Sequence, residues 1–209
     1  MYFVKTPFWL SMLYPKCTWK IPVTEKVIYL SFDDGPHPKA TPFVLETLAK
    51  YNAKASFFCI GNNVLSYPNI YTAIIEQGHV VGNHTYDHLN GWKTSLDTYI
   101  DNIKSAATLI DSNLFRPPYG RITRKQINAL IKRTNLPSRI IMWDVLSGDF
   151  DQKISTEKCC RNVIDNVEAG SIIVFHDSQK AWENMNYTLP KVLAHFTALG
   201  YRFDVLPIG

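Results

Sequence analysis

The sequence predicts an α/β fold in which parallel strands alternate with helices. Two observations support it: apolar, β-rich runs recur along the chain, and segments with helical spacing of apolar residues separate them. Repeated strand-then-helix units imply a parallel sheet, either closed into an irregular barrel or open and doubly wound. The length of 209 residues, with 46% hydrophobic and 19% charged residues, suits one globular domain.

Seven apolar runs are predicted strands, at residues 27–32, 55–60, 79–82, 114–116, 139–143, 171–175 and 201–206. The segments between them predict helices at residues 41–51, 69–77, 96–110, 123–133, 156–167 and 189–199. Several of these helices open with Ser, Thr or Asn, and two close at Gly78 and Gly200. No linker or low-complexity stretch divides the chain.

Residues 1–26 are predicted to form an arm packed on a catalytic domain at residues 27–209. The arm is apolar and aromatic, but charged residues and prolines interrupt it before it could supply a signal-peptide core or a membrane span. The alternative is a peripheral membrane contact through the apolar side chains Phe8, Trp9, Leu10 and Leu13. The predicted localisation is therefore cytoplasmic or peripheral to the inner membrane.

The charge of the chain is mildly basic, with a formal net charge of +4 and a pI near 8.8. Lys and Arg are scattered, so they form no run that could follow a phosphate backbone. Nucleic acid is not an expected partner, and the oligomeric state is left open.

The first polar cluster is Asp33 and Asp34, which end a predicted buried strand and precede a Gly-Pro turn. In α/β folds the carboxyl ends of strands carry the chemistry. Neighbouring side chains on an extended backbone point to opposite sides, so one carboxylate can bind a metal while the other acts as a general base. The alternative is an ordinary Asp-Gly-Pro turn.

His84 and His88 form the second cluster, four residues apart after another predicted strand. On a helical turn this spacing puts both rings on one face, so both can bind one ion. Asp34 would complete a His, His, carboxylate set with open positions for water and substrate. Two solvated or capping histidines are the alternative.

The third cluster is Arg116, followed by two prolines, Tyr119 and a glycine. The prolines hold the backbone rigid, so the guanidinium can orient a carboxylate and exposed backbone N–H groups can receive an oxyanion. A structural salt bridge is an equal alternative.

The last two clusters are the segment 142–150, with Asp144 and Asp149, and the segment 172–178, with His176. A carboxylate on the far nitrogen of His176 would keep its imidazolium form available for general acid catalysis. Either of the two acids could supply that carboxylate, and a purely structural histidine is the alternative.

All five clusters follow different predicted strands, so in a barrel they would meet at one rim. Their order, Phe-Asp-Asp-Gly-Pro, His-Thr-x-x-His, Arg-Pro-Pro-Tyr-Gly, Asp-Phe and Val-x-His, resembles the ordered motifs of the polysaccharide deacetylases, carbohydrate esterase family 4 or NodB-homology family. The resemblance covers residues 27–206 and implies the distorted (β/α)7 barrel of that family.

The resemblance implies that Asp34, His84 and His88 bind one divalent ion. The ion is usually zinc, although cobalt, manganese or nickel also suits such ligands. It further implies that Asp33 is the general base and that Arg116 orients it. The reaction is then the removal of N-acetyl groups from amino sugars in a poly- or oligosaccharide, which releases acetate.

By the same resemblance, the backbone N–H of Tyr119 stabilises the oxyanion and His176, tuned by Asp149, is the general acid. Two positions depart from the family pattern: Phe150 stands where Trp is usual, and Leu146 stands where many members carry another acid. These departures affect the sugar-binding groove more than the chemistry.

Three residues are expected to contact substrate: Val174 in the acetyl pocket, and Trp143 and Phe150 along the groove. Trp92 either borders the cleft or simply packs. The sugar polymer stays open among peptidoglycan, chitin-like oligomers, an exopolysaccharide and a lipid-linked precursor. Two other functions remain as alternatives: hydrolysis of a different N-acyl or imide bond, and a catalytically silent glycan-binding protein.

Overall fold

The computed structural model describes residues 2–132 and 136–207. Its strands are β1 (Cys17–Thr18), β2 (Val27–Asp33), β3 (Ala55–Cys59), β4 (Val80–Asn83), β5 (Leu114–Phe115), β6 (Arg139–Ile141), β7 (Val145–Leu146), β8 (Ile172–His176) and β9 (Arg202–Phe203). The main sheet has the order β1-β6-β5-β4-β3-β2-β8-β7, and β9 pairs with β2. Every strand pair is parallel.

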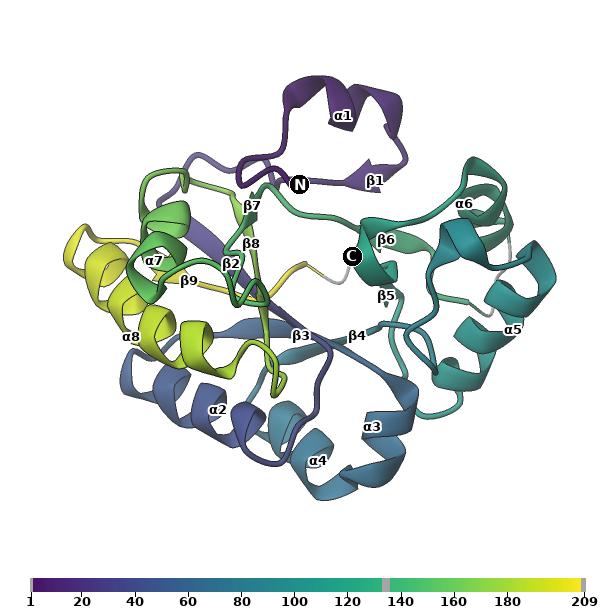
Figure 1. The fold of residues 1–209 in the computed structure, drawn as a ribbon, viewed down its shortest axis with the longest axis horizontal. Coiled ribbons are helices and arrows are strands. Elements are labelled where there is room, and N and C mark those ends of the chain that lie inside the picture. The colour runs from purple at the N-terminus through teal and green to yellow at the C-terminus, as the bar shows by residue number, and fades with distance from the viewer. Residues whose placement is uncertain (1, 133–135, 208–209) are drawn as a thin grey trace.

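Helices flank this curled sheet, most of them on its outer side (Figure 1). They are α1 (Phe8–Leu13), α2 (Ala40–Lys50), α3 (Gly61–Ser66), α4 (Pro68–Glu76), α5 (Leu96–Ala107), α6 (Arg124–Ile131), α7 (Thr156–Ile164) and α8 (Trp182–Ala198), with short 3₁₀ turns η1 (Gly91–Lys93) and η2 (Pro118–Gly120). The described part of the chain is therefore a half-barrel of parallel strands, which agrees with the predicted barrel-like α/β class.

The central strand β2 is buried along its whole length. Because side chains alternate along a strand, Ile28, Leu30 and Phe32 pack outward in the cluster beneath the helices. Val27 and Tyr29 belong instead to a second cluster inside the curl of the sheet. The inward face therefore carries apolar residues at its start and polar residues at its carboxyl end, where the barrel opens.

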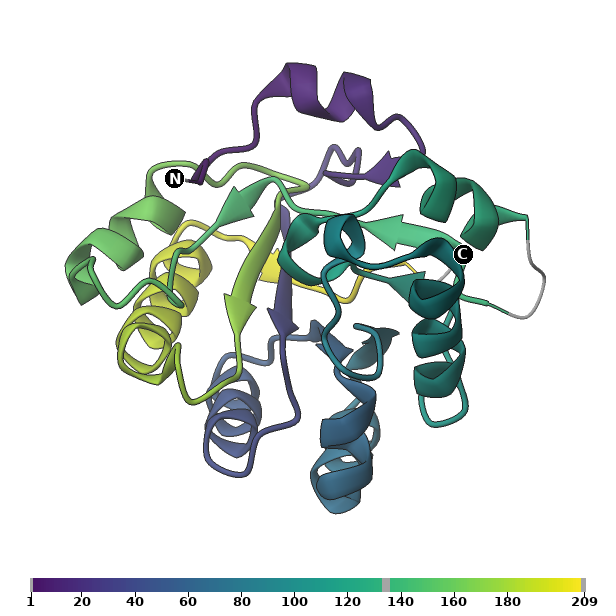
Figure 2. The ribbon, with the colours of Figure 1, turned by 45° about the vertical axis from the view of Figure 1, so that its right-hand side comes forward.

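The N-terminal arm closes the gap between the two edges of the sheet. On one side Cys17 pairs with Ile140 of β6. On the other side Lys5 forms a bridge with Val145 of β7, and the N–H of Leu146 donates to the carbonyl of Val4 at 2.8 Å. Figure 2 shows this arm, with α1, crossing above the strands. The arm is thus hydrogen-bonded into the sheet at both ends.

A partly exposed ion network fastens the arm to the domain. The Lys5 ammonium lies 2.7 Å from Asp144 and 3.1 Å from Glu168. Asp144 also accepts a hydrogen bond from the Ser171 hydroxyl at 2.5 Å. Asp144 therefore anchors the arm, and it is not the acid that contacts His176.

All seven predicted strands overlap an observed strand, but two short strands were not predicted. β1 and β7 have two residues each, too few for a periodic pattern, and they exist because the arm pairs with the barrel. α1 and α3 were also unpredicted, and α8 begins at Trp182 and continues through Pro190. The predicted helix end at Arg133 lies outside the described residues.

Candidate active site

Strand register brings the predicted site residues together at one end of the sheet. Asp33 at the end of β2 is directly opposite His176 at the end of β8. Asn83 at the end of β4 is opposite Phe115 at the end of β5, so the following residues His84 and Arg116 are also neighbours. Four of the five predicted clusters therefore meet here, and the remaining one joins them through Asp149, whose carboxylate lies 2.7 Å from the His176 Nδ1.

Asp34, His84 and His88 place three ligand atoms within 4.8 Å of one another. The Asp34 Oδ1 lies 3.1 Å from the His88 Nε2 and 3.6 Å from the His84 Nε2. His84 is buried, whereas about a quarter of each of the other two side chains is exposed. The cluster is thus closed on the protein side and open toward solvent.

The histidine segment is an irregular loop, so the predicted helical turn is wrong. Thr85 has φ 65° and His88 has φ 56°, which curl the backbone and turn both rings toward Asp34. The Asn83 side chain accepts from the N–H of Thr85 at 2.9 Å, and Asn102 on α5 accepts from two further N–H groups of this loop. Side-chain amides therefore hold the irregular loop in place, as backbone hydrogen bonds would hold a helical turn.

His84 is prepared to act as a metal ligand. Its Nδ1 lies 2.8 Å from the carbonyl oxygen of Arg116, and because a carbonyl only accepts, Nδ1 carries the proton and Nε2 presents a lone pair. Burial lowers the pKa of His84 to about 4, against the opposing effect of Asp33. The ring is therefore neutral at physiological pH, as metal binding requires.

The cluster fits a small divalent cation. The buried Oδ1 of Asp34 lies 3.1 Å from the His88 Nε2 but accepts no hydrogen bond of good geometry from the described residues, and it also faces the lone pair of the His84 Nε2. Burial alone would raise the pKa of Asp34, but His88, His176 and His84 lower it well below its ordinary value. An anionic oxygen beside imidazole nitrogens is satisfied by a cation with ligand bonds of about 2.0–2.2 Å.

Asp33 forms a buried ion pair with Arg116 at 2.7 Å. The guanidinium is fully buried and also donates to Ser31, Ile141 and Met142. Its carbon lies 4.0 Å from the centre of the Phe58 ring. Because all three nitrogens of the guanidinium donate hydrogen bonds, Arg116 holds the Asp33 carboxylate in one orientation.

Asp149 is the acid that holds His176. One of its oxygens lies 2.7 Å from the His176 Nδ1, and the other accepts from the backbone N–H of His176 at 2.7 Å. Burial alone would lower the pKa of His176, but the carboxylates of Asp149, Asp34 and Asp33 raise it to about 9. The ring is therefore an imidazolium at neutral pH.

Backbone strain is concentrated at this site. Within residues 2–132 and 136–207, five non-glycine residues have positive φ, and four of them, Asp34, Thr85, His88 and Tyr119, belong to the loops of this site. Because such conformations cost about 1–3 kcal/mol each, they persist only where the surrounding structure enforces them. Asp34 leaves the extended conformation at φ 79°, so the two aspartates separate through this turn and not through strand alternation.

Tyr119 borders the metal-ligand cluster. Its ring centre lies 4.6 Å from that of His88, and its N–H donates to no atom of the described residues. The following Gly120 is required, because a Cβ there would lie 2.6 Å from the Trp143 ring and the backbone has φ 64°. The loop therefore brings Trp143 close to the site.

The other predicted substrate residues lie around His176. Phe150 packs edge-on against the His176 ring at 5.2 Å and against Tyr2 of the arm at 5.2 Å. Val174 is buried in β8, two residues before His176.

Sequence reasoning missed several residues that support the site. Ser31, a polar residue inside an otherwise apolar strand, was a readable signal. Asp177 gave none: it is buried, it accepts from the Thr41 hydroxyl at 2.5 Å, and burial raises its pKa to about 8. A Cβ on Gly35 would lie 2.1 Å from its carboxylate, so Asp177 supports the turn that carries Asp34.

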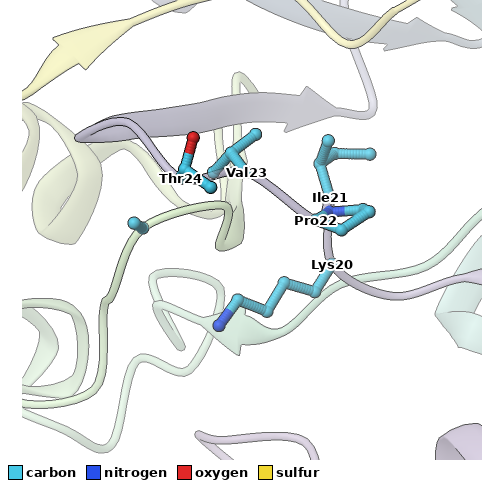
Figure 3. Close-up of a pocket in the computed structure, with 6 residues that line it drawn as sticks. Lys20, Ile21, Pro22, Val23 and Thr24 are labelled. Atoms are coloured by element: carbon cyan, nitrogen blue, oxygen red, sulfur yellow. The ribbon is translucent and has the colours of Figure 1, made fainter.

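A surface hollow away from this site is lined by Lys20, Ile21, Pro22, Val23, Thr24 and Ala169 (Figure 3). None of these six residues is a carboxylate, histidine or cysteine. The hollow therefore lacks the carboxylates and histidines that gather at the strand ends.

A curled parallel sheet with a His, His, Asp cluster that could hold a metal ion, a buried Asp–Arg pair and a carboxylate-bound histidine is an arrangement typical of a hydrolase. Comparison with known proteins supports this class. The polysaccharide deacetylase family model matches residues 20–136. A peptidoglycan-N-acetylglucosamine deacetylase of Bacillus cereus is 32% identical over 89% of this chain and 69% of its own length.

Two further relatives agree with this match. A chitooligosaccharide deacetylase of Azorhizobium caulinodans is 34% identical, over 76% of this chain and 77% of its own. The crystal structure of the Bc1960 peptidoglycan N-acetylglucosamine deacetylase superposes with a TM-score of 0.87 at 31% identity, covering 97% of this chain and 95% of that one. The chain belongs to the polysaccharide deacetylase family and is a hydrolase that removes N-acetyl groups from amino sugars.

Proposed function

We propose that Asp34, His84 and His88 bind one divalent ion, with zinc first and cobalt, manganese or nickel as alternatives. Their spacing, the neutral state of His84 and the unpaired Asp34 Oδ1 support this assignment. When bound, the ion supplies Lewis-acid polarisation of the acetamide carbonyl and of a water molecule.

Asp33 acts as the general base and accepts the proton of the attacking water. Arg116 keeps one oxygen of Asp33 bonded at 2.7 Å, which leaves the other oxygen free to face the substrate. Because the Arg116 carbonyl also fixes His84, one residue aligns both the base and a metal ligand.

The backbone N–H of Tyr119 donates to the oxyanion that forms on the acetyl carbonyl. His176, held by Asp149 as an imidazolium, donates its Nε2 proton to the leaving amine. The products are acetate and a free amino sugar. Val174 lines the acetyl pocket, and Trp143 and Phe150 border the sugar.

One observation supports this function most strongly: an aspartate–arginine pair and an aspartate–histidine pair both lie beside the cluster of Asp34, His84 and His88. The Asp33–Arg116 pair and the Asp149–His176 pair stand on adjacent strands β2 and β8, which carry Asp33 and His176 in register. The named relatives make a glycan containing N-acetylglucosamine the proposed substrate.

Acetate release from N-acetylglucosamine oligomers by the metal-reconstituted protein tests the proposal. We expect release from the oligomers and much less from N-acyl amino acids and cyclic imides. Preference for those compounds would favour hydrolysis of a different N-acyl or imide bond. Binding of oligomers without any acetate would indicate a silent glycan-binding protein.

We also propose that the arm, residues 1–26, touches a membrane surface peripherally while residues 27–209 carry catalysis. No helix in the described part of the chain is long and apolar enough to cross a membrane. Apolar side chains of the arm are nevertheless strongly exposed: Phe3 57%, Phe8 77%, Trp9 46%, Met12 70% and Leu13 48%. Side chains of this kind on a short helix insert at the lipid interface.

Sedimentation with phosphatidylglycerol vesicles checks the membrane contact. Phe8→Ser combined with Met12→Ser should lower the bound fraction, because the exposed apolar area of α1 is reduced. Ile75→Ser is the matched control, since Ile75 is 48% exposed on α4, away from the arm. Equal loss in both variants would contradict a specific role for the arm.

A further inference from the structure

A groove of about 400 Å³ runs between the arm and the catalytic loops. We call it the aromatic groove. Its arm side consists of Tyr2, Phe3, Thr6, Trp9, Leu10, Leu13, Tyr14, Cys17 and Trp19, and its loop side of Trp92, Tyr119, Gly120, Arg121, Ile122, Met142, Trp143 and Leu146. Its size lies in the range of about 300–1,000 Å³ that is usual for small-molecule sites.

The aromatic groove adjoins the metal-ligand cluster. Tyr119 forms part of its wall and also stacks near His88, with ring centres 4.6 Å apart. Trp143 and Leu146 lie on the segment that leads to Asp149. A ligand with its acetamide at the cluster can therefore extend directly into the groove.

The walls of the groove offer apolar surface, because many of their polar atoms are already bonded within the protein. The indole N–H of Trp19 donates to the Tyr14 carbonyl at 3.3 Å, and that of Trp92 donates to the Ile122 carbonyl at 3.1 Å. The Thr6 hydroxyl donates to the Trp143 carbonyl at 2.7 Å. The hydroxyls of a sugar ring bound there would lack hydrogen-bond partners, whereas a hydrocarbon chain needs none.

One cation stands on the loop side of the groove. The guanidinium carbon of Arg121 lies 4.0 Å above the Trp92 ring, and Arg121 is exposed. Stacking fixes the plane of the guanidinium while its N–H groups remain directed at solvent. An anionic group such as a phosphate, attached to an apolar chain in the groove, would find a bidentate partner there.

The groove is continuous with the exposed apolar surface of the arm. Phe3, Trp9 and Leu13 line the groove and are each also about half exposed. A long chain that enters the groove can therefore leave it along α1 without crossing a polar barrier. The metal-ligand cluster, Arg121, and the groove with α1 therefore match, respectively, the acetamide, the anionic group and the hydrocarbon chain of an amphiphile.

We propose that the aromatic groove binds the hydrocarbon chain of a lipid-linked N-acetylated glycan, with the linking phosphate at Arg121 and the N-acetyl sugar at the metal cluster. The substrate of the proposed deacetylation, on which this inference rests, is then an amphiphile. Its binding step can be measured without any turnover.

The first experiment measures binding of hexyl, octyl and decyl phosphate to the full chain by titration calorimetry below their micelle concentrations. Burial of each added methylene should tighten binding by up to about fourfold. Inorganic phosphate and an N-acetylglucosamine oligomer serve as probes without a chain. Affinity that is independent of chain length would overturn the proposal.

Variants locate the site. Leu10→Glu, which puts a carboxylate in the groove, should abolish the gain in affinity with chain length. Phe8→Glu is the matched control, because Phe8 lies on the same helix but does not line the groove. Arg121 lies on the loop side of the groove, so Arg121→Ala leaves the arm intact. This variant should weaken binding of the alkyl phosphate but not of the corresponding alcohol. Loss of alkyl phosphate binding in Phe8→Glu but not in Leu10→Glu would contradict the aromatic groove as the binding site.

The second experiment compares acetate release from a soluble N-acetylglucosamine oligomer and from the same sugar carried on decyl phosphate. We expect at least about tenfold lower KM for the amphiphile, and Leu10→Glu should remove this difference while leaving the soluble substrate unchanged. Equal KM values would overturn the groove assignment and leave deacetylation intact. Binding of decyl phosphate with no acetate from either substrate would instead refute the proposed function alone.

Discussion

Replacing Asp33 by Asn separates the base from the metal ligands. The substitution keeps the shape of the side chain and one oxygen that can accept from Arg116, but it removes the charge that accepts a proton. The three proposed metal ligands are untouched. We expect kcat to fall by about two to four orders of magnitude, the usual contribution of a general base, with full metal content.

The stability change follows from the surroundings of Arg116. Breaking a buried ion pair costs about 3–5 kcal/mol when a charge is left alone. Arg116 keeps three other oxygen acceptors, Ser31, Ile141 and Met142, and the Phe58 ring. We therefore expect a smaller loss of about 1–3 kcal/mol, or roughly 2–12 °C in Tm for a chain of this size.

Acetate release, elemental analysis and thermal unfolding of the same preparation provide the assay. Asp144→Asn is the matched control: Asp144 also holds a Lys5 partner at 2.7 Å, but it serves the arm. The control should lose stability and keep its kcat. Near-wild-type acetate release by Asp33→Asn would refute the assignment of the base, and loss of metal would refute the division of roles between Asp33 and Asp34.

Three other perturbations give sharp expectations. His84→Ala should lose the metal in elemental analysis, whereas His79→Gln, which alters a buried histidine at the opposite end of the strands, beside the first residue of β3, should retain it; equal metal content would contradict the ligand set. Because the pKa of His176 is raised to about 9, its acid form persists below that pH, so kcat should decline as pH rises through about 9. Asp149→Asn should move this decline to lower pH, and an unmoved alkaline limb would exclude His176 as the acid. Gly120→Ala should lower the free energy of unfolding in denaturant more than Gly200→Ala does. Both glycines have positive φ, but only a Cβ at Gly120 meets the Trp143 ring. Equal losses would show that the Trp143 ring shifts without cost.

The sequence predicted the part of the fold that depends on local pattern. β2, β3 and β8 are mostly apolar runs of at least five residues, long enough to be recognised. β1 and β7 depend on pairing between segments far apart in the chain, such as Val4 with Leu146. No local pattern encodes that contact, so the closure of the sheet by the arm was not predicted.

The site was predicted in its residue types and only partly in its geometry. The order of the polar clusters identified Asp34, His84 and His88, which the structure brings together. The turn at Asp34 and the irregular histidine loop were not foreseen, because positive φ at Asp34, Thr85 and His88 is imposed by neighbours. Asn83, Asn102 and Asp177 act through such tertiary contacts, which explains why spacing alone did not find them.

Metal titration of the chelated protein tests the central claim most directly. Protein stripped of metal should release no acetate from N-acetylglucosamine oligomers, and activity should return in proportion to added zinc and saturate at one ion per chain. His88→Ala, treated in the same way, should need far more zinc. Full acetate release by the stripped protein, or saturation with zinc and no acetate, would contradict a deacetylase built on Asp34, His84 and His88.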